Sequence, residues 1–135
     1  MATGNPEQAT RSVYEAIGGR ETVQRIVSIF YDLVEKDPRY AELRALHGPD
    51  LTETRKSLEG YLAGWFGGPR DWFEQNPGRC IMSVHSGIRI THTAAQQWVE
   101  AMSAAVRQSG IDTGLGVRLS VGMARVAAAM VVREE

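Results

Sequence analysis

The stretch Cys80-Ile-Met-Ser-Val-His-Ser-Gly-Ile-Arg-Ile-Thr-His-Thr-Ala-Ala-Gln-Gln-Trp98 decides how the rest of the chain is interpreted. It predicts a short helix that carries His85, a break at Ser86 and Gly87, and a new helix capped by Thr91. The neighbours of His85 are apolar or small. A neutral imidazole in such surroundings either bonds a backbone carbonyl within the core or offers a ring nitrogen to a metal that another group carries. His85 by itself leaves both roles open.

Composition excludes several classes of function. The 135 residues are enough for one domain with a buried core. The net charge of -1, without any basic block, gives no footprint for nucleic acid. A single cysteine excludes an internal disulfide, and with three histidines it gives no zinc-finger spacing. No apolar run reaches the roughly 18 residues of a membrane span. The N-terminus lacks a signal sequence, so we expect no membrane segment and a cytoplasmic location.

The first half of the chain predicts a flexible arm over residues 1–11, followed by four helices. Apolar residues recur at helical spacing between clear start and stop signals. We expect a helix from the Ser12–Glu15 capping box to Gly18, a second over 21–36, a short third from Pro38 to Leu46, and a fourth from the Asp50–Glu53 capping box to Gly67. Gly60 and Gly64 lie inside the fourth helix. Each costs about 1 kcal/mol relative to Ala, which indicates a close approach by another element.

The second half predicts further helices and no strand. Residues 70–78 have no helical pattern and are expected to be irregular, with Trp72 and Phe73 as apolar contacts. After the short helix of His85, a long helix runs from Thr91 to Gly110, and a last helix covers about 113–133. Six or seven helices with short connections predict a single all-α domain over residues 12–135.

The polar residues expected to point inward suggest a cofactor pocket. They are Tyr31, His47, Thr54, His85 and Trp98, each on a different helix or helix end. No Ser-His-Asp, paired-carboxylate or phosphate-loop pattern accompanies them. A few polar groups around an apolar interior are typical of a site for a large flat cofactor.

The order of motifs along the chain resembles the truncated haemoglobin family, and within it the second group. The resemblance covers about residues 12–130 and rests on Tyr-Glu-Ala-Ile-Gly-Gly (14–19), Phe-Tyr (30–31), Leu-His-Gly-Pro-Asp-Leu (46–51), Trp-Phe-Gly-Gly-Pro (65–69), His85, Ile-Arg-Ile (88–90) and Trp98. It implies a truncated globin, a two-over-two helical sandwich around haem b, in which the helix before the proximal histidine is reduced to a loop.

The resemblance also implies roles for single residues. His85 resembles the proximal histidine that ligates the haem iron, and Tyr31 the distal tyrosine that donates a hydrogen bond to bound dioxygen. Trp98 resembles a second distal donor, His47 a further donor to the ligand or to Tyr31, and Thr54 a residue at the distal gate. Structural alternatives stand beside each role. Tyr31 and Trp98 also fit as packing residues, His47 as a histidine facing a helix C-terminus, and Thr54 as a bystander.

The remaining cofactor contacts follow the same resemblance. The expected haem-wall residues are apolar, and ordinary core packing is their alternative: Phe30, Leu58, Met82, Ile88, Ile90 and Met102. The family often carries a basic pair beside a methionine before the proximal histidine and Ala-Pro-Phe after it. Here these stretches are Met82-Ser83-Val84 and Ser86-Gly87-Ile88. The haem propionates therefore need other partners, for which the candidates are Arg79, Lys56 or Arg89, and the indole N–H of Trp72.

The implied function is reversible binding of dioxygen, and of carbon monoxide or nitric oxide, opposite His85. Two alternatives remain open. The same pocket fits a haem enzyme, either a peroxidase or a nitric oxide dioxygenase, because storage and turnover need the same residues around the ligand. A haem-free helical interaction module is the other alternative. A reductase partner and the choice between monomer and homodimer also stay open.

Overall fold

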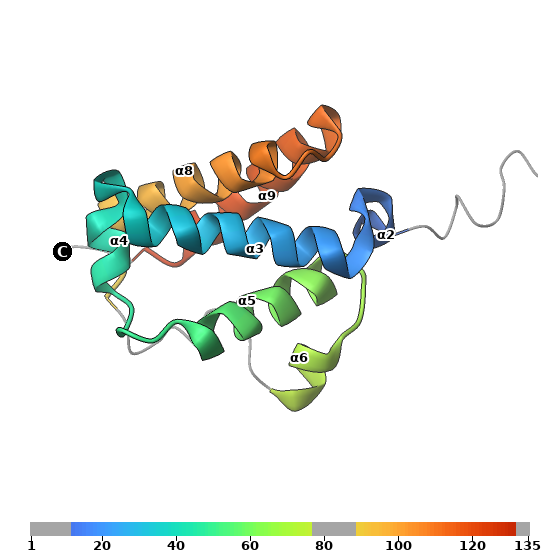
Figure 1. The fold of residues 1–135 in the computed structure, drawn as a ribbon, viewed down its shortest axis with the longest axis horizontal. Coiled ribbons are helices and arrows are strands. Elements are labelled where there is room, and N and C mark those ends of the chain that lie inside the picture. Colours follow the sequence, from blue (N-terminus) through green and yellow to red (C-terminus); the bar gives the residue numbers. More distant parts are fainter. Residues whose placement is uncertain (1–11, 77–88, 132–135) are drawn as a thin grey trace, which may run out of the picture.

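The computed structural model describes residues 12–76 and 89–131, and all regular structure in these two ranges is helical. The elements, labelled as in Figure 1, are α2 (Val13–Ile17), α3 (Gly19–Lys36), the 3-10 helix η1 (Pro38–Tyr40), α4 (Ala41–Ala45), α5 (Thr52–Trp65), α6 (Asp71–Gln75), α8 (His92–Gln108) and α9 (Thr113–Ala129). The predicted all-α class is confirmed. None of these described helices is long and apolar enough to cross a membrane.

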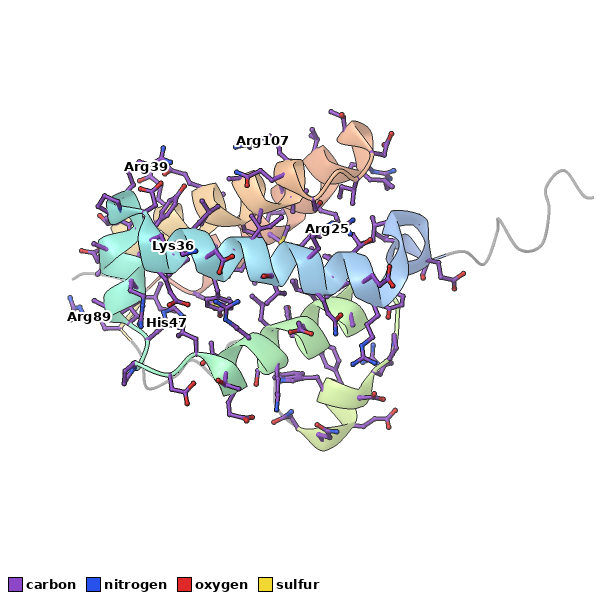
Figure 2. All side chains as sticks on the ribbon, in the orientation of Figure 1. Arg25, Lys36, Arg39, His47, Arg89 and Arg107 are labelled. Carbon is purple, nitrogen blue, oxygen red and sulfur yellow. The ribbon has the colours of Figure 1, made fainter. Side chains whose placement is uncertain are left out.

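Four long helices form two antiparallel pairs, α3 with α5 and α8 with α9 (Figure 1). Helix α3 lies between α5 and α8 and packs against both, so it joins the two pairs. Its apolar stripe, predicted from spacing, is buried, and Ile26, Val27 and Phe30 are among the most buried side chains described. In the N-terminal half of α3, Arg25 Nε donates to the Ser109 carbonyl at 3.0 Å and links α3 to the C-terminal end of α8 (Figure 2).

Two of the predicted helix caps are confirmed, and one is displaced. Ser12 Oγ accepts from the Glu15 amide at 3.2 Å, and Thr91 Oγ1 accepts from the Ala94 amide at 3.1 Å. The predicted Asp50–Glu53 capping box is wrong in detail. Asp50 Oδ1 accepts from the amide of Thr52 at 2.9 Å, so the carboxylate caps one residue earlier than in the expected box.

Helix boundaries differ from the predictions at several places. Helix α3 begins at Gly19, because Gly18 adopts a φ of 113° and turns the chain within one residue. The short third helix is a 3-10 turn followed by α4. The prediction of irregular structure over 70–78 is wrong for Asp71–Gln75, which form α6. A five-residue helix spans little more than one turn, so it is too short to show a helical period. The last helix ends at Ala129.

Helix α4 is held by polar contacts from α8. The side-chain oxygen Oε1 of Gln97 accepts from the Leu43 amide at 2.9 Å, and Thr91 Oγ1 donates to Glu42 Oε2 at 2.7 Å. Amides in the first turn of a helix have no partner within the helix, so a side chain that accepts from one of them fixes that end. These contacts fix the direction in which α4 leads into His47.

The two glycines inside α5 permit the close approach of another element that was expected from the energetic cost of glycine within a helix. A Cβ atom on Gly60 would lie 2.9 Å from Cβ of Trp72, and one on Gly64 would lie within 2.7 Å of two ring atoms of Phe73. Real Cβ atoms essentially never come so close to a neighbour. Glycine therefore allows α6 to pack directly on α5.

The substitution Gly64→Ala is expected to lower the free energy of unfolding. Displacing the Phe73 ring should cost about 1–3 kcal/mol, which exceeds the gain of about 1 kcal/mol in helix propensity. Urea unfolding followed by circular dichroism measures the difference. Gly48→Ala is the control, because nothing lies within 4 Å of a Cβ at that position. Equal stability of the two variants would contradict the close approach of α6.

Candidate functional site

A cavity of about 320 Å³ lies beside Tyr31. Helices α3, α5, α8 and α9 contribute to its wall, together with α6 and the segment after α4. The volume falls within the roughly 300–1,000 Å³ of pockets for small molecules and cofactors. Most of the wall is apolar or aromatic, and small residues of α8 and α9, Ala94, Ala95 and Ala127, leave the space open.

The cavity brings together most of the predicted site residues that the structure describes. Tyr31, His47, Thr54 and Trp98 line it, as do the predicted wall residues Leu58, Trp72 and Ile90. Thr54 and Leu58 are four residues apart in α5 and therefore share one helix face. The predicted positions His85, Arg79, Met82 and Ile88 lie outside the described residues.

Two predicted wall residues do not line the cavity. Phe30 and Met102 are 0% and 1% exposed and belong to the hydrophobic core. Phe30 precedes Tyr31 by one residue, and this turns its side chain about 100° around α3, away from the cavity. The Phe30 ring nevertheless contacts both Tyr31, at a centroid distance of 4.8 Å, and Trp98, at 5.7 Å. The structure places these two residues in the core behind the wall, and their contact with a cofactor stays a prediction.

Of the polar residues predicted for the site that the structure describes, Tyr31 is the most buried, with only 3% of its surface exposed. Burial raises the pKa of its phenol above the usual value, because the charged phenolate is poorly solvated, and the positive charge of Arg55 opposes this effect. Within the described residues, no protein group shares a hydrogen bond with its hydroxyl. Tyr31 is thus a neutral hydroxyl donor on an apolar wall.

His47 follows α4 and lies on the side that faces α5 (Figure 2). Its Nδ1 lies 3.0 Å from the Leu43 carbonyl oxygen. A carbonyl only accepts, so Nδ1 carries a proton, and in the neutral ring Nε2 is then an acceptor. The imidazole meets Tyr31 edge to face at a centroid distance of 5.8 Å. The contact with Leu43 fits a histidine at a helix C-terminus, and the contact with Tyr31 places the same ring at the cavity.

Sequence reasoning missed the contributions of α9 and of the end of α5. Met123 and Val126 of α9 and Met130, the residue after it, line the cavity, as do Tyr61 and Trp65 of α5. Tyr61 also contacts Trp72 at a centroid distance of 5.6 Å, which joins α5 to α6 at the wall. The sequence of α9 is typical of an ordinary core helix, and none of its residues at the cavity is a polar residue that would indicate a site. Only the return of α9 alongside α8 brings them to the cavity.

Comparison with known proteins decides the family. Residues 12–131 match the bacterial-like globin family. The chain belongs to this family. It is also 30% identical, over 105 residues, to the group 2 truncated hemoglobin YjbI of Bacillus subtilis, a match that covers 78% of this chain and 76% of that protein.

Solved structures agree with this globin assignment. The group II 2-on-2 hemoglobin of Agrobacterium tumefaciens superposes with a TM-score of 0.89 at 27% identity, covering 99% of this globin and all of that chain. The hemoglobin of Chloroflexus aurantiacus gives a TM-score of 0.82 at 32% identity, with 91% and 99% of the two chains covered. The two-over-two fold implied by the sequence resemblance is therefore confirmed.

Membership of the globin family makes the chain a haem protein for small diatomic ligands. The residues described at the cavity fit such a cofactor. A flat apolar macrocycle needs an apolar wall with aromatic side chains, which Leu58, Tyr61, Trp72 and Trp98 supply. The polar groups Tyr31, His47 and Thr54 line the same cavity. They give this globin a polar region within an otherwise apolar pocket.

Proposed function

We propose that this globin binds dioxygen reversibly, with haem b as cofactor and His85 as the iron ligand. When bound, haem supplies an iron that holds a diatomic ligand without net chemistry. The observation that carries the assignment of His85 is that the cavity is lined by residues that precede and follow it in the sequence. Trp72, before the segment 77–88, and Ile90, after it, both line the cavity. His85 is thirteen residues after Trp72 and only five before Ile90, so the chain on its C-terminal side links it closely to a residue of the cavity wall.

Tyr31 supplies the principal distal hydrogen bond in this proposal. Negative charge develops on the outer oxygen of bound dioxygen, and a preorganised hydroxyl donor stabilises it. Burial favours the neutral phenol, so the donor proton is retained at any physiological pH. Phe30, fully buried behind the cavity, contacts the Tyr31 ring and helps to hold it in place.

Trp98 supplies a second donor, and His47 a conditional one. The indole N–H can only donate, and within the described residues no group accepts from it. Because Nδ1 of His47 donates to Leu43, the neutral ring accepts at Nε2. Nε2 of the neutral ring can therefore accept a hydrogen bond from a hydroxyl, and it donates to a ligand only when the ring is protonated. Thr54 and Ser57 border the cavity on α5.

The visible absorption spectrum of the purified chain tests the proposal. We expect a Soret band in the ferric form that shifts on reduction and again when carbon monoxide is added. Oxygenation of the reduced form should be reversible by removal of dioxygen. Failure to take up added hemin would overturn the proposal in favour of a haem-free helical module. Rapid oxidation of the iron at each exposure to dioxygen would also count against reversible binding.

A further inference from the structure

Arg55 connects the two helices that border the cavity beside Tyr31. It lies in the first turns of α5, next to Thr54, and its Nη2 is 2.9 Å from Glu35 Oε1 and 3.5 Å from Asp32 Oδ1 on α3. The guanidinium carbon lies 5.4 Å from the centroid of the Tyr31 ring. One arginine therefore contacts a carboxylate pair and the proposed distal tyrosine at once.

The cation lies where it affects the phenol electronically. A guanidinium within about 6 Å of an aromatic centroid is attracted by the negative face of the ring. A positive charge there stabilises the phenolate relative to the phenol, which polarises the O–H bond and makes the hydroxyl a stronger donor. The charge of Arg55 accordingly acts to lower the pKa of Tyr31, against the larger effect of burial.

The two carboxylates orient the arginine more than they cancel its charge. The side chain of Arg55 is 28% exposed, whereas those of Asp32 and Glu35 are 53% and 41% exposed. Water and salt therefore screen the negative charges more strongly than the guanidinium, which also lies against the buried ring. The pairing keeps a long, flexible side chain over Tyr31, where it would otherwise sample many rotamers.

We propose that Arg55 is a positioning residue that strengthens the hydrogen bond from Tyr31 to the ligand, and that Asp32 and Glu35 hold it in place. The inference rests on the proposed distal role of Tyr31. It assigns ligand retention in part to a charge outside the cavity, since Arg55 does not line the cavity and does not touch the ligand in this account.

The test compares carbonyl and dioxygen complexes of the full chain with those of Arg55→Met, Arg55→Lys and Glu35→Gln. The C–O stretching frequency reports the electrostatic field at the ligand, independently of binding rates. We expect Arg55→Met to raise this frequency and to increase the dioxygen off-rate about two- to fivefold, the range that a cation–π contact at a partly exposed site implies. Arg55→Lys should restore part of both effects, because the charge is kept. Glu35→Gln should give a smaller change in the same direction.

The control is Lys36→Met, which removes the same charge from the exposed last turn of α3. It should leave the frequency and the off-rate unchanged. An Arg55→Met variant that is less stable but keeps the wild-type frequency and off-rate would show a purely structural role and overturn the inference. A change in the on-rate alone would also overturn it, because Arg55 would then control the entry of the ligand and not the hydrogen bond from Tyr31. Tyr31→Phe separates this failure from failure of the proposed function. If it changes the frequency while Arg55→Met does not, only the inference on Arg55 fails.

Discussion

Replacement of His85 by Ala is expected to abolish stable haem binding or to change the coordination of the iron. A ligand that bonds the metal directly contributes more than the groups that orient it, whose loss alone typically costs about 10- to 100-fold in metal affinity. Haem should therefore leave the variant at least that much faster than it leaves the natural chain. Transfer of haem to an excess of a high-affinity acceptor, followed at the Soret maximum, measures the rate.

The matched control for this experiment is His92→Ala. His92 begins α8, is exposed, and lies only seven positions further along the chain. Its loss should leave the haem transfer rate and the ferric spectrum unchanged. Adding imidazole to His85→Ala should restore the spectrum, because the free base fills the space of the missing side chain. A wild-type spectrum and transfer rate in His85→Ala would mean that another residue ligates the iron.

Replacement of Tyr31 by Phe is expected to speed ligand release and to leave haem affinity nearly unchanged. The substitution removes a hydroxyl and keeps the ring, so the contacts with Phe30 and His47 remain possible. A hydrogen bond to a charged partner contributes about 1.5–3 kcal/mol, which corresponds to an increase of about 10- to 100-fold in the dioxygen off-rate. Stopped-flow displacement of dioxygen by carbon monoxide measures this rate.

Tyr40→Phe is the matched control, since Tyr40 is also buried but does not line the cavity. Its off-rate should equal that of the natural chain. Trp98→Phe and the double variant determine whether the indole compensates for the lost hydroxyl. If the off-rate is unchanged in Tyr31→Phe and in the double variant as well, the distal role of Tyr31 is wrong.

Local signals in the sequence were sufficient for most of the helices. The stripe of apolar residues in α3, the cap at Ser12 and the cap at Thr91 depend on neighbouring residues alone, and the structure contains all three. The prediction failed at α6, which is too short to carry a periodic pattern and packs against glycines of α5. It also failed at the details of the Asp50 cap, because the geometry of the preceding loop selects which amide is reached.

The candidate site divides in the same way. Polar residues on apolar helix faces, such as Tyr31 and Trp98, could be identified from the sequence. Burying a polar group without a partner costs free energy, so a polar residue at a core-facing position indicates a special role. The sequence left the role of Phe30 and Met102 open, since an apolar residue on a core face looks the same whether it contacts a cofactor or another helix. The structure places both in the core. The contribution of α9 to the wall was invisible for the same reason.

The sequence by itself determined the all-α class, the main helices, and a set of polar residues that resembles the distal and proximal groups of truncated haemoglobins. These properties follow from residue spacing and from the chemistry of single side chains. Only the tertiary structure decided which helices border the cavity, that His47 bonds Leu43 through Nδ1, and that Arg55 reaches across from α5 to Tyr31 and Glu35. Such contacts join residues whose distance in space depends on how the helices pack, and packing is a property of the whole chain.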